Sequence, residues 1–233
     1  MLKAEITKKR RDIEVHVSLS IEKGGSLALF GSSGAGKSTV LACIAGLEEP
    51  DGGYVQLADL RIFPPSLPLH QRPIGYLTQE PHLFPHLSVR ENVCFGVNRH
   101  VEGEHARWIG TLRDRLRLGP LWEAHASRIS GGQARRVALA RMLARKPPLV
   151  LLDEPFSGLD RQLVRELIDD LLFWSRTEGF SMIAVDHQAE VLKRLCPDAV
   201  MVLEDGKAIQ QGTWESIYRA PATPLLQSLL SPL

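Results

Sequence analysis

The sequence predicts an α/β protein built around a mainly parallel sheet. Short apolar segments of strand length alternate along the chain with segments of helical periodicity. The strand segments are continuously apolar, which is typical of parallel strands buried on both faces. At 233 residues the chain suits one domain with an inserted subdomain. We therefore expect a single domain over residues 1–233, with a sheet core at about 1–79 and 147–233 and a helical subdomain at about 80–146.

The N-terminal part of the chain has the alternating pattern of an antiparallel β portion. Residues 2–6 and 13–21 alternate between apolar and polar side chains around the basic run at residues 8–11. We interpret that run as a solvated turn in preference to a ligand contact, because clustered charges usually remain in water. Later strands are expected at residues 26–30, 54–58, 74–78, 149–152 and 182–185, with a hairpin at 200–209. Helices are expected at residues 40–45, 89–95, 104–116, 133–145, 161–176 and 188–195, and a proline-rich loop at 63–68.

Residues 31–39 have the pattern of a phosphate-binding loop between a strand and a helix. Their glycines let the backbone fold close around an anion, and the first amides of the helix point at it. Lys37 supplies a cation for the β- and γ-phosphates, and Ser38 a hydroxyl for Mg²⁺. A glycine-rich helix cap is the simpler alternative, and the loop alone leaves kinase, GTPase and ATPase open. The candidate nucleotide-binding residues are Gly31, Ser32, Ser33, Gly34, Ala35, Gly36, Lys37, Ser38 and Thr39.

Two carboxylates and a histidine follow later apolar strands. Ligands of open α/β sheets bind at the carboxyl ends of the strands, so Asp153 and Glu154 are expected beside the phosphate loop. Asp153 is a candidate Mg²⁺ ligand, and Glu154 a candidate to polarise the attacking water. Turn or cap chemistry is the simpler explanation of this pair. His187 arrives at the same edge, where its imidazole can orient the water, although a lone histidine is more often a packing residue.

A second possible anion site precedes the helix expected at residues 133–145. Ser130, Gly131, Gly132 and Gln133 stand at its N-terminus, where free amides and the helix dipole favour an anion. Simple N-capping explains the same residues. One nucleotide does not need two such sites in one chain.

Together these motifs resemble the ATP-binding cassette (ABC) ATPases over nearly the whole chain. Six elements stand in that family's order and spacing. They are similar to the Walker A loop (31–39), the Q-loop (Gln79), the signature motif (129–133, with Ile129 for the usual Leu), the Walker B strand (149–154), the D-loop (157–160) and the switch histidine (His187).

The resemblance implies a P-loop ATPase that uses ATP and Mg²⁺ and works as a dimer, here expected to be a homodimer. Each ATP would lie between the Walker A loop of one subunit and the signature motif of the other. Glu154 would be the catalytic base, assisted by His187 and Gln79, while Ser38, Gln79 and Asp153 would hold Mg²⁺. The nucleotide-binding set would then also include Ser130, Gly131, Gly132, Gln133 and Asp160.

Residues 81–92 resemble the stretch of bacterial importers that meets the transmembrane subunits. This implies permease subunits and, indirectly, a solute-binding protein as partners, with the chain in the cytoplasm, peripheral on the inner face of the cell membrane. Among importers the ATPases for molybdate, sulfate and related oxyanions are the most similar. The alternatives are an exporter ATPase, a soluble non-transport ABC ATPase, which usually carries a coiled coil or a second cassette, and a nucleotide switch without turnover.

Two features depart from the family pattern. ABC ATPases commonly stack adenine on an aromatic residue upstream of the Walker A loop, but residues 7–12 contain none. Arg10 or Arg11 would stack through its guanidinium plane, or the base would be held loosely, so we expect weak discrimination among purine triphosphates. The chain also stops at Leu233, without the regulatory domain that many importer ATPases carry, so we expect no inhibition through such a domain within this polypeptide.

Composition limits other classes of function. The net charge of +1 gives no general attraction to nucleic acid. Cys43, Cys94 and Cys196 are scattered and odd in number, which fits a reducing compartment. No segment approaches the roughly 20 apolar residues that cross a bilayer, and the N-terminus lacks an apolar secretory core.

Overall fold

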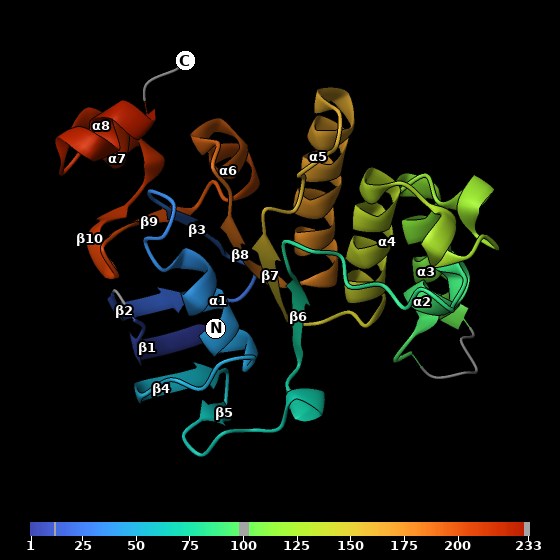
Figure 1. Ribbon diagram of the computed structural model, residues 1–233, viewed down its shortest axis with the longest axis horizontal. Coiled ribbons are helices and arrows are strands. Elements are labelled where there is room, and N and C mark those ends of the chain that lie inside the picture. The colour runs from blue at the N-terminus through green and yellow to red at the C-terminus, as the bar shows by residue number, and fades with distance from the viewer. Residues whose placement is uncertain (12, 98–102, 231–233) are drawn as a thin grey trace.

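The computed structural model describes residues 1–11, 13–97 and 103–230, so Asp12 and Leu233 lie outside the description. The described residues form one ten-stranded sheet with helices packed on it (Figure 1). The strands are β1 (Leu2–Lys9), β2 (Glu14–Ile21), β3 (Ser26–Phe30), β4 (Gly52–Leu57), β5 (Leu60–Phe63), β6 (Ile74–Leu77), β7 (Leu149–Asp153), β8 (Ser181–Val185), β9 (Ala199–Glu204) and β10 (Lys207–Gly212). The helices are α1 (Lys37–Ala45), α2 (Val89–Cys94), α3 (Gly103–Arg115), α4 (Gly131–Ala144), α5 (Arg161–Glu178), α6 (Ala189–Leu195), α7 (Trp214–Arg219) and α8 (Pro224–Leu230).

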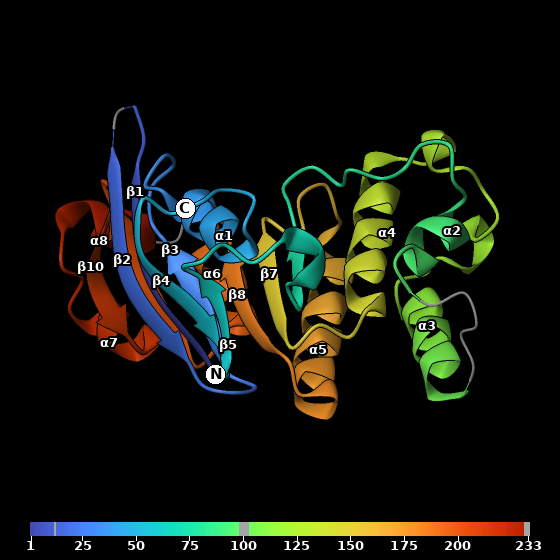
Figure 2. The same ribbon diagram turned by 90° about the horizontal axis from the view of Figure 1, so that it is seen from below.

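The strand order is β5-β4-β1-β2-β10-β9-β3-β8-β7-β6. The strands β9, β3, β8, β7 and β6 run parallel to one another, while β10 is antiparallel to β9. The strands β5, β4, β1 and β2 are antiparallel, and Figure 2 shows β1 and β2 as long strands along one side of the molecule. The α/β class, with a parallel core and an N-terminal antiparallel portion, is therefore confirmed.

The parallel strands are buried on both faces, as their continuous apolar sequences predicted. In β3, Leu27 and Leu29 join one buried cluster, while Ala28 and Phe30 join the other. The first cluster includes the apolar residues of α1, and the second includes those of α4, α5 and α6. Because helices cover both faces, only the edges of the sheet remain for polar chemistry.

Helices α2, α3 and α4 lie together at one end of the molecule, beside α5 (Figure 1). Trp108 of α3 meets Trp174 of α5 edge-on, with ring centroids 5.3 Å apart. Arg115 of α3 forms an ion pair with the buried carboxylate of Asp170 on α5. The division of the chain into a core and a helical subdomain at residues 79 and 147 stays a prediction.

Three elements were not predicted. Phe63, assigned to a proline-rich loop, instead ends the edge strand β5, which pairs with β4. Helices α7 and α8 follow the hairpin of β9 and β10; α7 buries Trp214 and Ile217, and α8 buries Leu226. Within the described ranges, no helix has both the length and the apolar character that a membrane span requires.

Candidate functional site

The phosphate-binding loop connects β3 to α1 in the arrangement that the sequence predicted. Gly31, Gly34 and Gly36 have φ angles of 146°, 80° and 96°, which favour glycine. Lys37 is buried, and its ammonium donates to the carbonyl oxygens of Gly31 (2.9 Å) and Ser32 (2.6 Å). Burial lowers the pKa of Lys37, and the nearby Asp153 and Glu154 oppose this. The loop thus holds a cation at its centre.

A cavity of about 750 Å³ opens over this loop. One wall is the β1–β2 hairpin, which packs tightly: a Cβ added at Gly36 would lie 2.7 Å from Val15 Cγ2. The lining residues are Arg10, Arg11, Ile13, Ser33, Gly34, Gly36, Lys37, Ser38, Thr39, Gln79, Glu154, Val185 and His187. The structure therefore brings Gln79, Glu154 and His187, predicted from three separate motifs, to the cavity above the phosphate loop.

Asp153 ends β7 and faces Ser38 at the start of α1. The Ser38 hydroxyl donates to Asp153 Oδ1 (3.2 Å), and the Tyr76 hydroxyl donates to Oδ2 (3.3 Å). Burial raises the pKa of Asp153, and these two hydrogen bonds oppose that shift. The sequence analysis did not single out Tyr76. The available signal was a tyrosine in an otherwise apolar strand, because a buried hydroxyl needs a hydrogen-bond partner.

The polar atoms around Asp153 fit Mg²⁺, because they are all oxygens. They include the carboxylate itself and the Ser38 hydroxyl that hydrogen-bonds to it. Among the described residues, no group of three or more His, Cys, Asp or Glu could hold a metal ion. A divalent ion here would therefore need ligands from Ser38, Asp153 and a bound phosphate chain, as Mg²⁺ in phosphate sites usually does.

Glu154 lies between a histidine and a glutamine. Its Oε1 is 2.6 Å from His187 Nε2, and its Oε2 accepts from Gln79 Nε2 at 3.3 Å. Its φ of 48° is left-handed, a strained conformation for a non-glycine residue. The backbone amide of Glu154 donates to Val185 O of β8 (2.9 Å), which fixes this turn. The carboxylate is thus held with its oxygens toward the cavity.

The residues Ser130 and Gln133 form a capping box at the start of α4. The Ser130 hydroxyl accepts from Gln133 N (3.3 Å), and the Gln133 side chain accepts from Ser130 N (2.8 Å). Asp160 caps α5 by accepting from Leu163 N (2.9 Å). The simpler explanation, helix capping, therefore holds for these residues in the single chain, and their contact with nucleotide stays a prediction.

The start of α4 does not reach the phosphate loop of the same chain. In both views β7 lies between α1 and α4 (Figures 1 and 2), and none of Ser130, Gly131, Gly132 or Gln133 lines the cavity. Gly132 instead approaches the 157–160 segment, where an added Cβ would lie 3.1 Å from Gly158 O. An anion held at the start of α4 would therefore lie away from this cavity.

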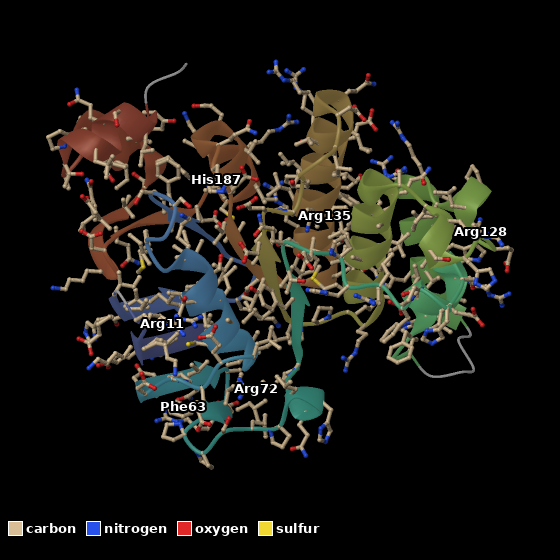
Figure 3. All side chains as sticks on the ribbon, viewed as in Figure 1. Arg11, Phe63, Arg72, Arg128, Arg135 and His187 are labelled. Atoms are coloured by element: carbon tan, nitrogen blue, oxygen red, sulfur yellow. The ribbon has the colours of Figure 1, made fainter. Side chains whose placement is uncertain are left out.

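The basic residues at the β1–β2 turn have different surroundings. Lys8 and Arg10 form ion pairs with Asp51 and Glu48, and so tie the hairpin to the turn after α1. Arg11 lines the cavity and has no ion-pair partner among the described residues. Figure 3 shows Arg11 beside the blue hairpin strands, with His187 further along the sheet edge. Both arginines proposed to stack on the base line the cavity, but Arg10 is also held by Glu48, so Arg11 is the better candidate.

Comparison with known proteins gives a consistent result. The family model described as ABC transporter matches residues 15–157. A thiamine import ATP-binding protein from Jannaschia sp. is 39% identical over 209 residues, which is 89% of this chain and 90% of that protein. A Fe(3+) ions import ATP-binding protein from Haemophilus influenzae is 38% identical over 210 residues, covering 88% of this chain and 58% of that protein.

A sulfate/thiosulfate import ATP-binding protein from Synechococcus elongatus is 37% identical over 219 residues, covering 93% of this chain and 63% of that protein. The chain thus spans about 60% of the length of several curated relatives it matches. A solved ATP binding subunit of an ABC transporter superimposes with a TM-score of 0.83 at 25% identity, covering 99% of both chains. A dimeric cassette in a post-hydrolysis state bound to ADP and Pi has a TM-score of 0.77 at 26% identity, covering 91% of this chain and 98% of that one.

Proposed function

The chain belongs to the ABC transporter family, and we propose that it is the ATP-hydrolysing subunit of an importer. The observation that carries the proposal is the placement of Glu154. Its carboxylate lies between His187 and Gln79, beside the loop that holds Lys37 and Ser38. A base, two groups that orient it and a phosphate site thus share one cavity, which is the arrangement that hydrolysis of a nucleoside triphosphate requires.

In the proposed reaction, Lys37 contacts the β- and γ-phosphates through an ammonium already aimed into the loop. Glu154 accepts a proton from the attacking water while the water oxygen bonds to the γ-phosphorus and the ADP oxygen leaves. His187 and Gln79 fix the carboxylate and hydrogen-bond the transferred group. Ser38, Asp153 and Gln79 would hold Mg²⁺, whose charge would neutralise that of the phosphates.

We further propose that the active form contains two copies of the chain. Ser130, Gly131 and Gly132 stand at the start of a helix suited to an anion, yet none of them lines the cavity over the phosphate loop of the same chain. A second copy facing the first in the opposite direction would bring its Ser130 onto the γ-phosphate. Its Gln133 and Asp160 would lie at the same interface. The solved dimeric cassette in the family supports this arrangement.

The surface proposed to receive a transmembrane permease lies between β6 and α4. A cavity of about 460 Å³ opens there, lined among others by Phe84, Phe95 and Met142. The Phe84 and Phe95 rings pack 4.2 Å apart, and Phe95 is 51% exposed. An exposed aromatic hollow of this kind suits a short partner helix. The chain would then sit at the inner face of the membrane without crossing it, and a solute-binding protein would act through the permease.

The transported solute is proposed only as a class. Relatives named for import of sulfate/thiosulfate and of molybdate/tungstate support an inorganic oxyanion. Relatives named for import of Fe(3+) and thiamine are equally similar to this chain, so Fe(3+) and thiamine are the alternative solutes to test. Reconstitution with a candidate permease and uptake of labelled sulfate, molybdate, Fe(3+) and thiamine would separate them.

The test of hydrolysis compares the native chain with Glu154→Gln in a steady-state phosphate-release assay with Mg²⁺. We expect turnover to fall by about a hundredfold or more, because the amide cannot take a proton. Glu215→Gln, at an exposed side chain of α7, is the matched control and should leave turnover unchanged. Near-normal turnover by Glu154→Gln would remove Glu154 from its role. Failure to co-purify with any transmembrane permease would exclude the importer assignment.

A further inference from the structure

We propose that Arg135 is a positioning residue for hydrolysis, which no sequence motif assigned. From α4, its guanidinium holds the backbone immediately before Gln79 and so sets the Gln79 side chain against Glu154. The inference rests on the proposed ATPase function and adds a physical link between the helix that begins after Ser130 and the catalytic carboxylate.

Arg135 contacts the residue that precedes Gln79. Its side chain is buried, with 5% of its surface exposed, and Nη1 donates to the carbonyl oxygen of Thr78 at 2.7 Å. Thr78 is the first residue after β6, where the sheet no longer fixes the backbone. The Thr78 hydroxyl donates to Glu80 O at 2.6 Å, which folds the segment around Gln79. Arg135 thus reaches this turn from α4, while Arg141 of the same helix donates to the next two carbonyls, Pro81 O and His82 O, at 3.0 Å each.

The turn held by Arg135 determines where the Gln79 amide lies. Gln79 Nε2 is 3.3 Å from Glu154 Oε2, a distance near the limit for a hydrogen bond. A small shift of the Thr78 carbonyl would therefore break the contact with the carboxylate. In a site that depends on orientation, displacement of one group by about 1 Å can lower the rate by about a hundredfold.

Helix α4 is packed tightly enough to act as a fixed support. A Cβ on Gly75 of β6 would lie 2.7 Å from Met142 Cγ, and a Cβ on Gly132 would lie 3.1 Å from Gly158 O. The helix therefore contacts β6, which leads to Gln79, and the segment that follows Glu154. Figure 3 shows Arg135 on the α4 side of the sheet edge. A movement of the Ser130 end of α4 would then also move the turn before Gln79.

The charge of Arg135 matches its surroundings. A buried guanidinium is costly unless it is hydrogen-bonded and compensated. Burial lowers the pKa of Arg135, and the negative charges of Glu154 and Asp153 oppose this. The carbonyl of Thr78 and the two carboxylates together explain why a cation is kept at this buried position. A neutral side chain of similar volume would keep the packing and lose the support.

The test uses Arg135→Met and Arg135→Lys, with Arg136→Met as the matched control. Arg136 is the next residue of α4, and its guanidinium also donates to backbone carbonyls, Leu116 O (2.9 Å) and Arg117 O (3.3 Å). Those carbonyls follow α3, away from Gln79. The control therefore removes similar hydrogen bonds from the same helix without touching the turn.

Two readouts are needed, hydrogen exchange of the backbone amides at residues 78–80 and the kinetics of ATP hydrolysis. In Arg135→Met we expect faster exchange at residues 78–80 and a fall in kcat of about 10- to 100-fold, with KM for ATP changed by less than about threefold. Arg135→Lys should recover part of both, since an ammonium can reach the same carbonyl. Arg136→Met should show native exchange at residues 78–80 and a near-native kcat.

Native exchange at residues 78–80 in Arg135→Met would overturn the proposal. An equal loss of kcat in Arg136→Met would also overturn it, because the effect would then be a general weakening of α4. Failure of the proposed function is a separate outcome: the native chain would not hydrolyse ATP, while the exchange comparison would still report on the contact between Arg135 and Thr78.

Discussion

Substitution of Gly31 by alanine should destabilise the chain far more than the same change at Gly34. Both glycines lie in the phosphate-binding loop and both have positive φ angles, 146° and 80°. They differ in their surroundings. A Cβ on Gly31 would lie 2.1 Å from the carbonyl oxygen of Leu203, whereas a Cβ on Gly34 would meet nothing within 4 Å.

The magnitude follows from this contact. Since an ordinary van der Waals contact begins at 3.4 Å, β9 would have to move away from β3 by about 1 Å, which breaks hydrogen bonds of normal length. The pairs Leu29–Met201 and Phe30–Val202 lie next to the clash. Two ladder bonds at about 1 kcal/mol each, with about 1–2 kcal/mol for left-handed backbone, give a loss of about 3–4 kcal/mol. Gly34→Ala should cost only the backbone part, about 1–2 kcal/mol.

The assay is urea denaturation of the nucleotide-free chain, with thermal melting as a second measure. At about 2–4 °C per kcal/mol for a chain of this size, Tm should fall by about 6–16 °C in Gly31→Ala and about 2–8 °C in Gly34→Ala. Equal losses in the two variants, or a loss below about 1 kcal/mol in Gly31→Ala, would refute the reasoning that contact with β9 fixes the shape of the loop.

Two further predictions concern charged groups of the site. Because burial raises the pKa of Asp153, its ionisation destabilises the nucleotide-free chain as pH rises above the ordinary Asp value. Asp153→Asn should therefore raise Tm at pH 7, gain less at pH 4 and abolish Mg²⁺-dependent hydrolysis; a Tm gain independent of pH would contradict this. Arg11→Ala should weaken ATP binding by about two- to fivefold through loss of stacking on the base, while Arg10→Ala, which removes a cavity-lining side chain already paired with Glu48, should weaken it less. A native preference for ATP over GTP of about a hundredfold, or about 2.7 kcal/mol, would contradict the loose hold on the base.

The sequence was enough to predict the position of residues that follow buried strands. Asp153, Glu154 and His187 each lie within two residues of the end of an apolar segment, and the parallel sheet brings the ends of such segments to one edge. The loop at Gly31 was equally predictable, because the alternation of strand, glycine loop and helix is local in sequence.

The residues missed are those whose partners lie far away in sequence. Arg135 is separated by 57 residues from Thr78, and Tyr76 by 77 residues from Asp153, so neither contact leaves a local pattern. The sequence also could not choose between Arg10 and Arg11, since only the fold places Glu48 against the former. The short helices α7 and α8 were missed because each buries too few residues to give a periodic signal.

The proposed mechanism requires that ATP joins two copies of this chain, with Ser130 of one over the phosphate loop of the other. Sedimentation velocity of Glu154→Gln tests it directly, because that variant should hold ATP without cleaving it. We predict a dimer in saturating ATP and Mg²⁺, and a monomer with ADP or without nucleotide. A monomer in saturating ATP, or a dimer whose amount is the same without nucleotide, would contradict the proposed ATP-dependent dimer.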